Sequence, residues 1–85
     1  MPATHPQRVL ITAGGSGIGH AMASAFAAEG SQVWVTDVDA AALARCPDTW
    51  KRSEVDSADE PAVAALFGEI EKDWGGLDAL CANAG

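Results

Sequence analysis

Basic residues are scarce in this 85-residue chain, which has five Lys and Arg against twelve Asp and Glu and a formal net charge of −7. Proteins that bind nucleic-acid backbones do so with clustered Lys and Arg, and helices that lie on membranes carry a basic face. The cations here are dispersed without forming a stripe, at Arg8, Arg45, Lys51, Arg52 and Lys72. We therefore expect neither a nucleic-acid partner nor a membrane partner.

Cysteine and histidine are also scarce, with two of each. Cys46 and Cys81 lack the C-x-x-C spacing of metal and redox motifs, and the histidines have no ligand-type neighbours. We expect neither a disulfide framework nor a metal site. Residues 1–7 lack the apolar core of a signal peptide, and no apolar run is long enough to span a membrane. These features predict a reduced, cytoplasmic setting.

The composition that remains is that of a small globular domain, with 48% hydrophobic and 20% charged residues. A chain of this length makes one domain at most. We assign residues 1–7 to a loose N-terminal tail and residues 8–85 to the domain.

The strongest functional signal is the stretch V-L-I-T-A-G-G-S-G-I-G of residues 9–19. A short apolar run stops at glycines set among small residues, and a helix-forming segment begins at once. This succession predicts an anion site, because unpaired N–H groups and the positive end of the helix dipole point outward from the turn. Glycine has no Cβ, so a pyrophosphate can approach the backbone closely.

Two common phosphate-binding motifs do not match this turn. An NTPase loop needs Lys-Ser or Lys-Thr after its last glycine, where His20 and Ala21 stand, and G-x-G-x-x-G needs a third glycine where Met22 stands. The pattern T-G-x-x-x-G-I-G fits, with Ala13 in place of its first glycine and Gly14 one residue later, where we expect it to keep the turn flexible. The matching positions are Thr12, Gly17, Ile18 and Gly19.

Strand and helix patterns alternate along the whole chain, which predicts a parallel sheet with helices on its faces. Apolar positions at steps of four (Ile18, Met22, Phe26) predict the buried face of the first helix, and S-x-x-E from Ser57 predicts a capping box for the third. The expected strands cover residues 8–12, 31–36, 49–55 and 77–82, and the expected helices cover 17–29, 40–45 and 57–73.

Acidic and small residues follow the predicted strands. Asp37 ends the second strand 20 residues after Gly17, where a dinucleotide site places the carboxylate that binds the ribose hydroxyls. That carboxylate would repel a 2′-phosphate. Neither Ser16 nor Val38 is a basic residue that could hold such a phosphate, so we expect NAD rather than NADP. Asp56 follows the third strand and suits either an adenine contact or ordinary helix entry.

Taken together, T-A-G-G-S-G-I-G of residues 12–19, Asp37, Asp56 and A-N-A-G of residues 82–85 resemble the classical short-chain dehydrogenase/reductase family. The resemblance implies a Rossmann-type, doubly wound parallel α/β sheet, of which about four strands and three helices are present and the C-terminal half is missing. It departs from the family at Ala13 and Ala82, where glycine and often asparagine are usual.

The resemblance also implies a set of residues that bind NAD. Residues 14–19 would hold the pyrophosphate and the nearby ribose, and residues 83–85 the ribose beside the nicotinamide. Asn83 also resembles the family asparagine that ties neighbouring strands together. The full set is Gly14, Ser16, Gly17, Ile18 and Gly19 for the turn, Asp37 and Val38 for the adenosine ribose, Asp56 and Ser57 for the adenine, and Asn83, Ala84 and Gly85.

The family's catalytic residues are absent from this sequence. Its catalytic serine and its Tyr-x-x-x-Lys lie beyond the N-A-G motif, and the chain contains no tyrosine. We therefore expect the chain alone to be inactive and to have no catalytic residue. The resemblance implies a complete enzyme that interconverts a small alcohol and a carbonyl by hydride transfer, with the missing C-terminal half as partner, assembled as a homo-oligomer, a dimer or tetramer.

Three hypotheses follow. The leading one is the N-terminal, cofactor-binding portion of an NAD-dependent oxidoreductase. The second is a non-catalytic NAD-binding regulatory or scaffold module, and the third is a structural fragment that binds nothing. The lack of catalytic residues favours the second, whereas the chain carries no recognisable partner-binding motif.

Overall fold

The computed structural model describes residues 6–15 and 17–83 of the chain, in which strands and helices alternate as predicted. The expected and observed ranges overlap, and the first, third and fourth strands are shorter than expected. Within the described part, no helix is both long and apolar enough to cross a membrane. The elements are β1 (Arg8–Ile11), α1 (Gly17–Ala28), β2 (Gln32–Asp37), α2 (Ala40–Ala44), β3 (Lys51–Glu54), α3 (Glu60–Trp74) and β4 (Ala79–Cys81).

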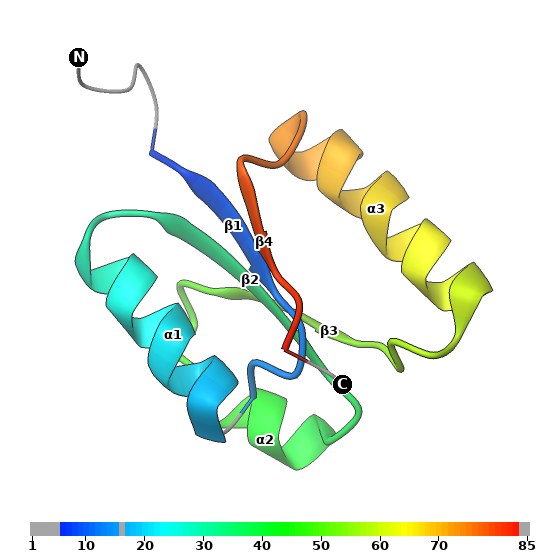
Figure 1. Cartoon of the computed structure of the whole chain (residues 1–85), viewed down its shortest axis with the longest axis horizontal. Coiled ribbons are helices and arrows are strands. Elements are labelled where there is room, and N and C mark those ends of the chain that lie inside the picture. Colours follow the sequence, from blue (N-terminus) through cyan, green and yellow to red (C-terminus); the bar gives the residue numbers. More distant parts are fainter. Residues whose placement is uncertain (1–5, 16, 84–85) are drawn as a thin grey trace.

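The four strands form one parallel sheet in the order β3-β2-β1-β4. Helices α1 and α2 cover one face and α3 covers the other (Figure 1), which confirms the doubly wound α/β prediction. The chain leaves β1 toward β2 on one side, and β4 returns to the other side of β1. Ligands of such sheets bind outside the carboxyl ends of the strands at this reversal of strand order.

The core is built on strands whose two faces are both covered. Val9 and Ile11 pack beneath α1 and α2, whereas Leu10 faces Leu66 and Ile70 of α3. Burial on both faces explains the continuous apolar runs at residues 9–11 of β1 and 33–35 of β2. The edge strand β3 has the sequence K-R-S-E and is mostly exposed, which explains its weaker, alternating signal.

The buried face of α1 differs from the prediction. Ile18 is 74% exposed, whereas Ala23 is fully buried and Met22 and Phe26 pack against the core. The reason lies in the first turn of the helix, where Gly19 is the residue that faces the sheet. Successive helical residues are rotated by about 100°, so Ile18 points to solvent.

The predicted capping box of α3 is wrong. The N-cap is Asp59, whose carboxylate accepts a hydrogen bond from the Ala62 N–H at 3.2 Å. A cap at Ser57 would put Pro61 where the first intrahelical hydrogen bond needs a donor, which proline lacks. With the cap at Asp59, Pro61 falls in the first turn, where no donor is needed.

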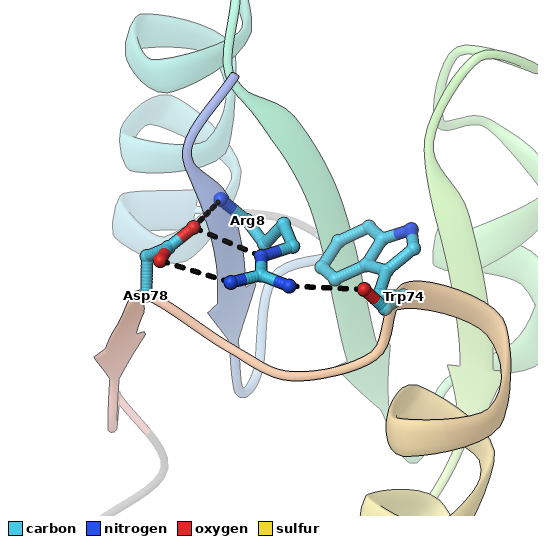
Figure 2. Close-up of polar contacts among 3 residues, drawn as sticks. All are labelled: Arg8, Trp74 and Asp78. Carbon is cyan, nitrogen blue, oxygen red and sulfur yellow. Dashed lines mark hydrogen bonds and ion pairs between the residues drawn. The ribbon is translucent and has the colours of Figure 1, made fainter. Parts of the chain in front are cut away.

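Arg8 joins β1 to the end of α3 and the start of β4 (Figure 2). Its main-chain N–H and its Nε donate to Asp78 Oδ2 at 2.8 and 3.0 Å, and Nη2 donates to Oδ1 at 3.2 Å. Nη1 donates at 3.0 Å to the Trp74 carbonyl, one of the carbonyls left unpaired at the helix end. The hydrogen bond to Asp78 raises the pKa of Arg8 above its ordinary value.

We expect Arg8→Met to lower the urea midpoint of unfolding, because the Asp78 carboxylate loses its two side-chain donors and the Trp74 carbonyl loses the Nη1 donor, whereas the main-chain N–H of residue 8 stays. Asp78→Asn should lower it as well. The double variant should lose less stability than the two single variants added together, because both disrupt the same side-chain hydrogen bonds between Arg8 and Asp78.

The control is Lys51→Met, which breaks an exposed ion pair to Asp73 with a 3.6 Å separation between Nζ and Oδ2. It should change the free energy of unfolding by less than about 0.5 kcal/mol. Strictly additive losses for Arg8→Met and Asp78→Asn would contradict the account of the Arg8 network.

Candidate functional site

The turn after β1 lies directly against β2. The Gly14 N–H donates to the Thr36 carbonyl at 2.8 Å, and a Cβ on Gly14 would be 2.7 Å from Val35 Cγ1. Gly14 is buried, and its φ is not positive. It is therefore needed for close packing rather than for the flexibility that the sequence suggested.

Two other turn residues adopt the left-handed backbone conformation. Ala13 has φ +54° and Gly17 has φ +64°. A Cβ on Gly17 would meet nothing within 4 Å, so glycine is required there only by its backbone conformation. Ala13, which stands at the usual glycine position of the pattern, adopts the same conformation with a side chain.

Gly19 allows the first turn of α1 to pack onto the strand ends. A Cβ on Gly19 would collide with the Ala13 carbonyl oxygen and would lie 2.8 Å from Asn83 Nδ2. Asn83 also donates its main-chain N–H to Thr12 Oγ1 at 2.9 Å, which links the ends of β1 and β4. This link comes from the Asn83 main chain, so the role expected of the asparagine side chain stays a prediction.

The Asp37 carboxylate is held by main-chain donors on two sides. Its Oδ2 accepts the Gly15 N–H at 3.1 Å, and its Oδ1 accepts the Asp39 N–H at 3.1 Å. Gly15 lies within the range 14–19 predicted for the pyrophosphate, but the sequence analysis did not name it singly and predicted no contact with Asp37. Its sequence signal is its place beside Gly14, in a turn that must pass close to the end of β2.

A hollow of about 330 Å³ opens at the carboxyl ends of the strands. The residues predicted for the adenosine part of NAD all line it, although they come from β2 and from the segment after β3. Asn83 does not line this hollow and lies by Gly19 instead. Gly17 and Ile18 are exposed at the start of α1, whereas Ser16, Ala84 and Gly85 lie outside the described residues. The lining consists of Ala13, Asp37, Val38, Val55, Asp56, Ser57 and Ala58.

The hollow is acidic, because Asp37 and Asp56 line it and none of its lining residues is Lys or Arg. The Asp56 carboxylate also accepts the Ala58 N–H at 2.9 Å. The helix-entry interpretation of Asp56 is therefore confirmed, and the same residue lies on the wall of the hollow, where the adenine contact stays a prediction. An uncharged, hydroxyl-rich ligand group suits these acceptors better than an anion.

His20, in the first turn of α1, contacts Cys46 and Trp50. The His20 ring lies 5.2 Å from the Trp50 ring, and its Nδ1 is 3.9 Å from Cys46 Sγ. Burial raises the pKa of the Cys46 thiol, so this group stays protonated and a poor nucleophile at neutral pH. Across residues 6–15 and 17–83, no group of three or more His, Cys, Asp or Glu could hold a metal ion.

Comparison with protein families and curated proteins gives a consistent result. A family model described as short chain dehydrogenase matches residues 7–85. The 3-oxoacyl-(acyl-carrier-protein) reductase MabA of Mycobacterium avium is 39% identical over 84 residues, which are 99% of this chain and 31% of that protein. D-xylose 1-dehydrogenase of Caulobacter vibrioides is 36% identical over 93 residues, covering 99% of this chain and 35% of that protein. The chain spans about a third of the length of these relatives.

Solved structures have the same fold. The aldohexose dehydrogenase of Thermoplasma acidophilum matches with a TM-score of 0.84 and 28% identity, over 95% of this chain and 30% of that one. A short chain dehydrogenase from Bacillus anthracis matches with a TM-score of 0.87 and 28% identity, over 96% of this chain and 36% of that one.

Ala13 and Gly17 share the left-handed conformation, so exchanging alanine and glycine at these two positions should change the free energy of unfolding in opposite directions. In Ala13→Gly, relief of about 1–2 kcal/mol of backbone strain outweighs the about 0.4–1 kcal/mol lost to the greater freedom of glycine in the unfolded chain. We expect a net gain of about 0.5–1 kcal/mol in the free energy of unfolding, measured in urea.

Gly17→Ala is the matched reverse change, because its Cβ would enter open space at a positive φ. It should lower the free energy of unfolding by about 0.5–1 kcal/mol. Destabilisation by Ala13→Gly would show that the Ala13 methyl group contributes more than its backbone strain costs.

Proposed function

The chain belongs to the short-chain dehydrogenase family, and from this premise we propose that it is the N-terminal, NAD-binding portion of an oxidoreductase. The complete protein would interconvert a small alcohol and a carbonyl compound. The observation that carries the proposal is the hollow at the carboxyl ends of β2 and β3, which joins the predicted adenosine-binding residues beside the glycine turn. When bound, NAD supplies the hydride chemistry.

Gly17 fits the turn to a pyrophosphate, because it is exposed at the start of α1 and carries no side chain. The buried glycines at positions 14, 15 and 19 let the turn pack closely, because a Cβ at each would come too close to a neighbouring atom. Main-chain N–H groups at the start of α1 favour an anion, and the positive end of the helix dipole adds to this preference. The residues of the turn would bind and orient the cofactor and would take no part in proton transfer.

Asp37 supports a preference for NAD over NADP. A carboxylate accepts hydrogen bonds from ribose hydroxyls, whereas it repels a 2′-phosphate. Asp56 adds a second carboxylate to the same wall, and Val38, the neighbour of Asp37, is uncharged. In the proposed complex, Asp37 and Val38 would contact the ribose, and Asp56 and Ser57 the adenine.

The oxidoreductase proposal requires further polypeptide, because the chain has no tyrosine to move the proton. Exposed apolar side chains beside one sheet edge support this. Leu80 on β4 is 51% exposed and Phe67 on α3 is 42% exposed, and both line one apolar hollow. We propose that a C-terminal polypeptide covers them, in a cytoplasmic homo-oligomer.

The second candidate is a non-catalytic NAD-binding module, which the absence of tyrosine favours. An assay of NADH formation separates the two candidates. A longer polypeptide that contains this chain and oxidises an alcohol would support the oxidoreductase. A longer polypeptide that binds NAD without turnover of any alcohol would support the module.

Calorimetric titration of the 85-residue chain with NAD and NADP tests the cofactor proposal. We expect NAD to bind more tightly than NADP. Asp37→Ala should weaken NAD binding about 10- to 100-fold, because hydrogen bonds to a charged acceptor are lost. Its NADP affinity should stay equal or rise, because the repulsion is removed.

The control is Asp48→Ala, which removes a carboxylate that is fully exposed and does not line the hollow. It should leave both affinities unchanged. Equal NAD affinity in Asp37→Ala and the unmodified chain would refute the assigned site, and no NAD binding by the unmodified chain would refute the proposed function.

A further inference from the structure

We propose that Gly15 is a positioning residue for cofactor discrimination, because its N–H and its missing side chain together set the place of the Asp37 carboxylate. The inference rests on the proposed function and deepens it. It assigns selectivity for the adenosine ribose to a contact between the glycine turn and β2, rather than to Asp37 alone.

The first support is the pair of main-chain hydrogen bonds to Asp37. Gly15 donates to Oδ2 and Asp39 donates to Oδ1, each at 3.1 Å. A carboxylate has about four acceptor positions, so two remain for ribose hydroxyls. The carboxylate is therefore oriented before any ligand arrives, and the entropy of ordering it does not count against binding.

The second support is steric. A Cβ on Gly15 would lie 2.9 Å from Asp37 Oδ2 and 3.0 Å from the Cβ of Ala42. Ala42 is fully buried in α2, and its N–H is bonded to the Asp39 carboxylate at 3.2 Å. Because Ala42 cannot retreat, the Asp37 side chain is the group that must move.

The third support is the backbone of Gly15, whose φ lies outside the left-handed region. An alanine there avoids the strain of a left-handed φ, so its effect is expected on space and on the hydrogen bond. Gly15 thus differs from Gly17, where the backbone conformation requires glycine. The Gly15–Asp37 hydrogen bond also spans 22 residues of sequence, so displacement of the carboxylate disturbs the contact between turn and β2.

The test is Gly15→Ala, with NAD and NADP affinities measured by calorimetry. We expect NAD affinity to fall about tenfold, the effect of losing one oriented charge-assisted hydrogen bond. The NADP affinity should stay nearly constant, so the ratio of the two affinities falls by the same factor. A merely destabilising change would lower both affinities alike and leave the ratio unchanged, which would overturn the proposal.

Gly68→Ala is the matched control, because a Cβ on this exposed residue of α3 meets nothing within 4 Å. It should leave both affinities unchanged. The double variant Gly15→Ala with Asp37→Asn tests whether Gly15 acts through Asp37. Its affinity ratio should equal that of Asp37→Asn alone, and a further drop would contradict the positioning role.

A measurement without ligand separates this inference from the proposed function. Amide hydrogen exchange, followed by NMR, should show the Gly15 N–H protected in the free chain and exposed in Asp37→Ala. Asp37→Asn keeps one acceptor oxygen for the Gly15 and Asp39 N–H groups and should restore part of the protection. An unprotected Gly15 amide in the free chain would overturn the inference even if NAD binds, whereas absence of NAD binding with a protected amide would overturn only the proposed function and the selectivity built on it.

Discussion

The structure depends on three buried glycines, Gly14, Gly15 and Gly19, which leave no room for a Cβ. At positions 14, 15 and 19 a Cβ would come too close to Val35, to Asp37 and Ala42, or to the Ala13 carbonyl and Asn83. This closeness is what allows α1 to begin directly over the strand ends. It also brings the ends of β2 and β4 to the same turn, although they are far apart in sequence. The tight packing and the candidate binding surface are thus the same feature.

Charged side chains are paired differently at the two ends of the sheet. At the amino ends of β1 and β4, Arg8 and Asp78 join strands and helix through a network of charged hydrogen bonds (Figure 2). At the carboxyl ends, the carboxylates of Asp37 and Asp56 line an open hollow and retain acceptor positions. Charge is paired where it stabilises the fold and left partly unpaired where a ligand can approach.

Much of the architecture could be predicted because the signals are local. Alternating strand and helix patterns predict a parallel sheet, and parallel strands gather the residues that follow them at one edge. Asp37, Val38, Asp56 and Ser57 therefore line one hollow as a consequence of topology. The family resemblance and the observed fold agree on this arrangement.

The sequence predictions fail at positions whose surroundings are set by tertiary packing rather than by the local sequence. Ile18 matched the apolar spacing of α1, yet the contact of Gly19 with the turn rotates it to solvent. Ser57 matched a capping box, but the proline in the first turn of α3 requires the cap at Asp59. The role of Gly15 depends on a carboxylate 22 residues away, which no spacing rule within the turn predicts.

The most direct test of the central claim is an NMR titration of the chain with NAD, in which amide shift changes are mapped onto the structure. We expect the changes to concentrate at Gly14, Gly15 and Gly17, at residues 37–38 and at residues 56–57. Changes that are absent from these positions, or that concentrate at the amino ends of the strands around Gly30 and Lys51, would contradict the proposed binding site.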